Sequence, residues 1–177
     1  GGDRAMIKQA WVVLVLLAGL MAASSPAWSG SVGQSTAGFL KLGVDARTTA
    51  LGDAGTANAS GAGALYWNPA ALIKVEHRSA TLMHATWLES TFFDYAAYAQ
   101  NLNESSVLGA NVQYFSAGTI DRTDASGSNI GSFSPSGLAL SLGYAKETDW
   151  VTLGLAAKFI RSSIVNSASA LALDAGA

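Results

Sequence analysis

The chain has 177 residues, of which 50% are hydrophobic and only 12% are charged, against about 25% charged residues in ordinary globular domains. Its formal net charge is −2 and it contains no cysteine. High hydrophobicity with few charges argues against disorder, and ten scattered Lys and Arg residues argue against nucleic-acid binding. Without cysteine there are no disulfides, zinc ribbons or thiol nucleophiles. With 19 glycines, the composition favours a membrane β-protein over a cytosolic enzyme.

The N-terminal region is typical of a secretory signal peptide. Met6 is the expected initiator, which leaves residues 1–5 as a non-native or upstream remnant. The uncharged run at 11–21 is eleven residues long, which is shorter than the ~20 residues that a spanning helix needs. Small residues follow, with cleavage sites up to Ser29. We therefore assign residues 6–29 to a signal peptide, with an uncleaved anchor as the alternative.

The rest of the chain contains six segments that predict β-strands. They are residues 79–87, 92–100, 106–115, 136–145, 150–159 and 168–177. The third, fourth and fifth alternate with period two. In the fourth, for example, Leu138, Leu140 and Leu142 share one face, and Ala139 and Ser141 share the other. Segments of about ten residues with one oily face match transmembrane β-strands that cross a bilayer at a tilt.

The connections and the aromatic residues support the same interpretation. Short links at 101–105 and 146–149 alternate with a longer polar loop at 116–134, as in outer-membrane barrels with short periplasmic turns. Aromatic residues expected at strand ends, Phe93 and Phe159 among them, fit interfacial girdles. We predict an all-β fold, an antiparallel transmembrane β-barrel; a soluble β-sandwich or a small ligand-binding barrel is the alternative.

Several polar residues fall within the predicted strands and are candidates for a lumen-facing set. They are Asp94, Asn111, Gln113, Lys158 and Asp174. In a barrel they would either line a path or pair with one another.

Residues 39–72, between the signal peptide and the strands, follow neither the strand period nor a clean helix period. Three sequence elements occur there in order: a G-x-x-A-R, an L-G-x-x-G and a Y-W-N-P-A. Together they resemble the N-terminal signature of the PorV/PorQ-type outer-membrane proteins, relatives of the FadL-like long-chain fatty-acid transporters. Ala54 and Ala71 stand where that signature commonly has glycine. The matching residues are Gly43, Arg47, Leu51, Gly52, Gly55, Tyr66, Trp67, Asn68, Pro69 and Ala70.

The resemblance implies that residues 30–78 form a plug or hatch on the periplasmic side of the barrel lumen. Residues 79–177 would then be the first five to six strands of the barrel. A single-chain bacterial barrel needs about eight strands or more, and open sheet edges in hydrocarbon are prohibitive. We therefore expect the chain to be the N-terminal part of a longer barrel.

Two local expectations concern the plug. Asn68-Pro69 suits a helix start, with Asn68 as the N-cap and Pro69 at the first helical position. The cation Arg47 could pair with a lumenal carboxylate such as Asp94 or Asp174. Glycines in this stretch allow tight turns and close backbone approach.

No pattern predicts catalysis, a cofactor or a metal. Gly61-x-Gly63 is not continued as a dinucleotide-binding fingerprint. His77 and His84 lack the spacing of a metal site or a triad. The acidic stretch 121–129 lacks the spacing of a Ca²⁺ loop. We predict that the protein is not an enzyme and has no cofactor.

The resemblance implies two functions from different classes. PorV-type members act in type IX secretion, with secreted proteins or the secretion machinery as partners. A FadL-like channel would instead carry hydrophobic small molecules such as long-chain fatty acids. Either protein would sit in the lipid bilayer of the outer membrane of a Gram-negative-type bacterium, after signal-peptide cleavage. The closer motif match favours secretion.

Overall fold

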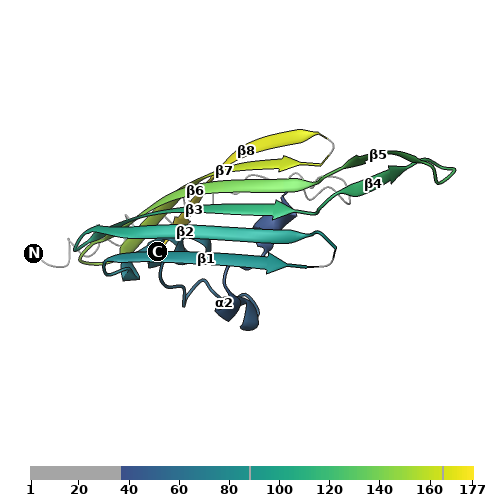
Figure 1. The fold of residues 1–177 in the computed structure, drawn as a ribbon. Coiled ribbons are helices and arrows are strands. Elements are labelled where there is room, and N and C mark those ends of the chain that lie inside the picture. Colours follow the sequence, from purple (N-terminus) through teal and green to yellow (C-terminus); the bar gives the residue numbers. More distant parts are fainter. Residues whose placement is uncertain (1–36, 88, 165) are drawn as a thin grey trace, which may run out of the picture. The chain divides into compact units, whose positions relative to one another are not determined.

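The computed structural model describes residues 37–87, 89–164 and 166–177 (Figure 1). The expected remnant at 1–5 and the signal peptide at 6–29 lie outside these residues. In the described part of the chain, no helix has the length and apolar character needed to cross a membrane.

Strand pairing dominates the described residues. A six-stranded sheet has the order β1-β2-β3-β6-β7-β8, and every neighbouring pair is antiparallel. This confirms the all-β antiparallel fold, and the strands differ from the predicted segments only at their ends. Their bounds are β1 Arg78–Thr86, β2 Phe92–Asn103, β3 Ser106–Ser116, β6 Ser136–Glu147, β7 Thr152–Ser163 and β8 Ser167–Gly176.

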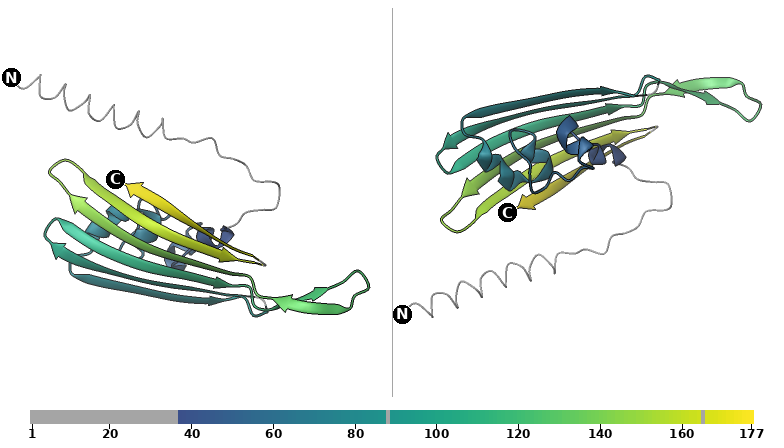
Figure 2. Two further views of the ribbon diagram at one scale, coloured as in Figure 1. Left: turned by 90° about the horizontal axis from the view of Figure 1, so that it is seen from above. Right: turned by 90° about the horizontal axis from the view of Figure 1, so that it is seen from below.

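The stretch at 116–134, predicted as a polar loop, instead contains a hairpin. Strands β4 (Ile120–Thr123) and β5 (Asn129–Phe133) pair with each other and extend beyond one end of the large sheet (Figures 1 and 2). In the turn between them, Asp124 Oδ1 accepts the backbone N–H groups of Ser126 and Ser128, both at 2.9 Å. Hydrogen bonds from Ser126 and Ser128 lower the pKa of Asp124. The side chain of Asp124 thus organises a turn that polar composition alone does not reveal.

Four short helices cover one face of the large sheet, which we call the inner face (Figure 2). They belong to residues 37–77, the helical segment, and the opposite face of the sheet is the outer face. The helix bounds are η1 Gly38–Lys41, α2 Ala46–Ala50, α3 Ala64–Trp67 and η2 Pro69–Lys74.

Small residues on the inner face allow the helical segment to pack closely. A Cβ atom added at Gly154 would lie 2.1 Å from the backbone nitrogen of Ala70 in η2. One added at Gly143 would lie 2.2 Å from Leu65, and one at Gly137 would lie 2.4 Å from the Phe39 ring. The glycines of the strands therefore form the recesses that receive the helices.

The outer face carries large apolar side chains in register. One row of paired residues across all six strands is entirely apolar: Leu82, Ala96, Val112, Leu140, Phe159 and Leu171. The next row is Ala80, Tyr98, Ala110, Leu142, Ala157 and Leu173. Leu171 and Leu173 are 83% and 85% exposed.

The register also gives two aromatic residues positions that differ from the expected outward-facing strand ends. Phe93 is fully buried on the inner face, among the core residues. Phe159 pairs with Leu140 and Leu171 within the outer apolar row, because β7 continues to Ser163. Phe93 therefore does not face outward, and Phe159 does not lie at a strand end.

We predict that Gly154→Ala loosens the helical segment. The added methyl group would meet backbone atoms of η2, which cannot rotate away, so the free energy of unfolding should fall by about 1–3 kcal/mol. Gly63→Ala is the matched control, because the nearest atom to its added Cβ is 3.9 Å away. Urea unfolding and limited proteolysis of residues 37–77 measure both variants. Equal stability of the two variants would contradict the close contact.

Candidate functional site: the helical segment on the inner face

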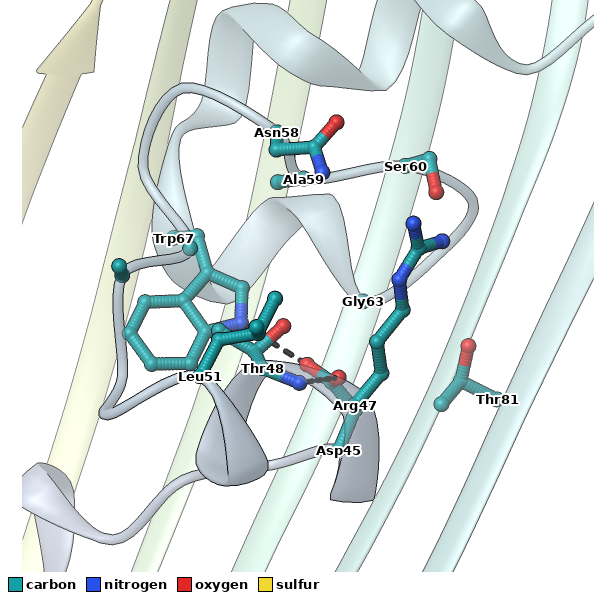
Figure 3. A pocket seen from close by; sticks show the side chains of 12 residues that line it. Asp45, Arg47, Thr48, Leu51, Asn58, Ala59, Ser60, Gly63, Trp67 and Thr81 are labelled. Carbon is teal, nitrogen blue, oxygen red and sulfur yellow. Dashed lines mark hydrogen bonds between the residues drawn. The ribbon is translucent and has the colours of Figure 1, made fainter.

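Asp45 holds two parts of the helical segment together (Figure 3). It is the N-cap of α2, where its Oδ1 accepts the Thr48 N–H at 2.7 Å. Its Oδ2 accepts the indole N–H of Trp67, in α3, at 3.1 Å. Burial acts to raise the pKa of Asp45, but the hydrogen bonds from Thr48 and Trp67 and the charge of Arg47 outweigh it and lower the pKa below its ordinary value.

Tyr66 links the helical segment to the sheet. Its hydroxyl donates to the carbonyl of Leu40 at 2.8 Å. Its ring meets Trp67 edge-on with centroids 4.7 Å apart, and meets Tyr95 of β2 with centroids 6.5 Å apart. Burial, followed by the charge of Asp53, raises the pKa of the Tyr66 hydroxyl. Tyr66 therefore stays neutral and serves as a packing residue with one hydrogen bond.

The N-P-A part of the Y-W-N-P-A motif forms the start of η2. Asn68 is the N-cap and accepts the Ala70 N–H at 3.0 Å, with Pro69 at the start of the helix. This is the helix start that the sequence predicts, although the helix is of the 3₁₀ type. Ala70 lies over Gly154 in β7. The motif thus fixes the point at which the segment enters its recess in the sheet.

Residues of the G-x-x-A-R and L-G-x-x-G motifs shape the loop around α2. Gly52 has φ +70°, a left-handed conformation that favours glycine. At Gly55 an added Cβ would lie 2.4 Å from the Trp67 ring. An added Cβ at Gly43 would lie 2.1 Å from Thr49 Oγ1. Leu51, the C-cap of α2, is exposed.

Arg47 extends from α2 into a cavity of about 140 Å³ (Figure 3). Asn58, Ser60 and Thr81 also line this cavity. The expected pairing of Arg47 with Asp94 or Asp174 does not occur, because these carboxylates pair with His84 and Lys158 respectively.

A polar band crosses the inner face beneath the helical segment. Asn111 pairs across strands with Ser141, and Gln113 with Tyr95. All four side chains are buried, and Gln113 is 0% exposed. Among the described residues, the buried side-chain polar atoms of Gln113 and Ser141 have no hydrogen-bond partner, whereas the Tyr95 hydroxyl lies close enough to Asn111 to interact with it. Burying such a group without a partner costs about 1–3 kcal/mol, so this band opposes the packing of the segment.

The predicted lumen-facing residues do not all share one face. Lys158 and Asp174 lie on the inner face with Asn111 and Gln113, and form an ion pair of 2.9 Å. Asp94 lies on the outer face, opposite Tyr114 in the register and paired with His84. The grouping of Asp94 with the others is corrected for this reason. The neighbouring inward positions are taken by Phe93 and Tyr95.

Sequence reasoning missed three residues of this site. Asp45 has a usable signal, because an Asp just before a helix is a common N-cap. Ser141 belongs to the small face of a predicted strand, but nothing in the sequence shows that a helix covers it. Tyr95 is a large aromatic residue whose inward direction depends on the register of β2.

Comparison with protein-family models matches residues 29–177 to the family described as "Type IX secretion system protein PorV". The chain belongs to the PorV family. No curated protein and no solved structure matches the chain. The family description names a secretion-system protein and not an enzyme. It agrees with the PorV side of the resemblance and gives no specific support to a FadL-like channel.

We predict that Asp45→Asn weakens the helical segment of this PorV-family chain. Asparagine can still accept from Thr48, but its amide nitrogen cannot accept from the Trp67 indole, so about 1 kcal/mol of stability should be lost near neutral pH. The folded pKa of Asp45 lies below its ordinary value of 3.8. The charged form therefore contributes stability above pH 3.8, which disappears as the pH falls through the folded pKa. Hydrogen exchange of residues 37–77 at several pH values measures the difference between wild type and variant, which should vanish in acid. A difference that persists in acid would contradict this assignment.

We also predict that Gln113→Met raises the free energy of unfolding by about 1 kcal/mol. The change keeps the shape of the side chain and removes two buried polar atoms without described partners. Gln100→Met is the control, since Gln100 lies on β2 and accepts a hydrogen bond from Tyr98 at 3.2 Å. Chemical unfolding in detergent compares the two variants. Destabilisation by Gln113→Met would mean that a bound molecule satisfies the amide.

Proposed function

We propose that this chain is an outer-membrane component of the type IX secretion machinery. In this proposal the six-stranded sheet forms part of the wall of a β-barrel, and the helical segment is a plug on its lumenal side. Support comes from the family match, from the apolar outer face and from the packing of the segment on the inner face. The expected location is the outer membrane of a Gram-negative-type bacterium, after removal of a signal peptide.

The outer face is the observation that carries the membrane part of this proposal. Soluble monomers rarely expose contiguous apolar patches larger than a few hundred Å², yet two apolar rows cross all six strands here. Five of these strands have 10 to 12 residues and β1 has 9. About 9–11 residues cross a bilayer at a tilt. Contact with lipid accounts for both the length and the surface.

Closure of the sheet is part of the proposal. Within the described strands, β1 and β8 each have a neighbour on one side only. In hydrocarbon, every backbone N–H and C=O group needs a partner, so a sheet can span a bilayer only when its edges are paired. We therefore place the six strands within a closed barrel.

The secretion role assigns a partner surface to the β4–β5 hairpin. Its residues 120–132 are exposed and it extends beyond the end of the sheet (Figure 1). Secreted proteins or other secretion components would meet the barrel there. A channel for hydrophobic small molecules would need an apolar cavity near the plug. The cavity beside α2 has a mixed lining in which Leu51 and Trp67 lie beside Arg47, so the preference for secretion rests on the family match.

The test is to express the protein with its signal peptide, fractionate the envelope and isolate the native protein from detergent. We expect migration that changes on heating, recovery in the outer-membrane fraction, and co-purification of secretion components or exported proteins. Replacing residues 120–132 with a short Gly-Ser linker should preserve membrane recovery and abolish co-purification. Recovery with bound lipid and no protein would favour the channel, and a soluble periplasmic product would reject the barrel.

Two arginine substitutions separate lipid contact from water contact in the same preparation. Leu142 on the outer face and Ile130 in the hairpin are similarly exposed, at 58% and 54%. In water both changes would be nearly neutral. In a bilayer, Leu142→Arg should cost about 2–4 kcal/mol if it lies near the midplane, and Ile130→Arg should remain neutral. Equal stability of the two variants would reject lipid contact.

A further inference from the structure

The cavity beside α2 contains an arginine that forms no salt bridge among the described residues. Arg47 points toward Ser60, with Asn58 and Thr81 nearby (Figure 3). Within the described residues, the salt bridges are formed by other side chains and none includes Arg47. Arg47 is exposed, and its guanidinium N–H groups are available at the cavity to a ligand or to water.

The nearest acid, Asp45, is already engaged. Its two oxygens accept from the Thr48 N–H and from the Trp67 indole. Asp45 still lies within the same cavity lining and lowers the net local charge. Because the Asp45 carboxylate repels any anion that enters the cavity, a dianion such as a phosphate monoester is disfavoured more than a single negative charge, and a monoanion must be held by direct hydrogen bonds from Arg47.

We propose that this cavity binds the carboxylate of a polypeptide, either a chain terminus or an acidic side chain. A guanidinium group matches a carboxylate because its parallel N–H groups can donate to both oxygens at once. The hydroxyl groups of Ser60 and Thr81 and the amide of Asn58 supply further neutral donors. The site stands on this geometry, whereas the choice of an exported polypeptide as the source of the carboxylate rests on the proposed function.

The size of the cavity limits the ligand. A volume of about 140 Å³ is below the roughly 300–1,000 Å³ of pockets that enclose drug-sized ligands. A carboxylate with the short carbon chain that carries it fits this space, and the rest of a polypeptide would lie outside it.

The test measures binding of three short peptides to the full chain, purified from membranes in detergent, by calorimetry. Acetyl-Ala-Ala has a terminal carboxylate, acetyl-Ala-Glu-amide has one on a side chain, and acetyl-Ala-Ala-amide has none. We expect at least one of the two acids to bind and the amide not to bind. The acid that binds more tightly identifies the source of the carboxylate. Equal binding of the amide, or no binding by any of the peptides, would overturn the proposal.

Substitutions then assign the binding to Arg47. Arg47→Gln should weaken binding of the acid roughly tenfold or more, and Arg47→Lys should have an intermediate effect because it keeps the charge and loses the planar fork. Arg78→Gln is the matched control, since it removes the same charge from the exposed first residue of β1, outside the lining of the cavity. Binding that survives Arg47→Gln, or that falls equally with Arg78→Gln, would overturn the site. If the wild-type protein binds the carboxylate but no secretion components co-purify with it, this result would contradict the proposed function and leave the binding site standing.

Discussion

Close contact between the helical segment and the glycines of the sheet is the constraint on which this structure depends. At Gly154 the backbone of η2 occupies the space that any larger residue would need. Leu65 fills the recess at Gly143 in the same way, and the Phe39 ring fills the one at Gly137. Because side chains alternate along a strand, small residues on the inner face leave the large apolar ones on the outer face. One period-two pattern therefore specifies both the recesses for the segment and the apolar outer surface.

The polar band sets the strength of this attachment. Phe39 packs on the sheet on one side of the band, and Leu65 and Leu72 pack on the other, against Gly143 and Gly109. Between these contacts lie buried side chains such as Gln113, whose polar atoms lack described partners. At about 1–3 kcal/mol for each unsatisfied group, the band offsets part of what the apolar contacts contribute.

The sequence predicted the strands well because their alternation is a local property. It could not fix the facing of β2, where Phe92 and Phe93 are adjacent and either could be the inward residue. The grouping of Asp94 with the lumen-facing residues requires Phe92 to face inward, because residues two apart share a face. The structure instead buries Phe93. The hairpin β4–β5 was missed for a different reason, since its residues are exposed and carry no apolar alternation. Its turn is closed by the side chain of Asp124 together with backbone hydrogen bonds from Asp124 to Ser128 and from Gly127 to Asp124.

The helical segment shows the opposite limit of sequence reasoning. Its motifs can be recognised in the sequence, but the structural role of each motif residue depends on contacts between residues far apart in the chain. Trp67 and Asp45 are joined by a hydrogen bond that no spacing rule predicts, and no salt bridge joins Asp45 to Arg47 among the described residues. Asp45 and Arg47 carry opposite charges and are only two residues apart, yet they have different roles. The carboxylate of Asp45 stabilises the segment, while the guanidinium of Arg47 remains directed into the cavity with its hydrogen-bond donors available to a ligand.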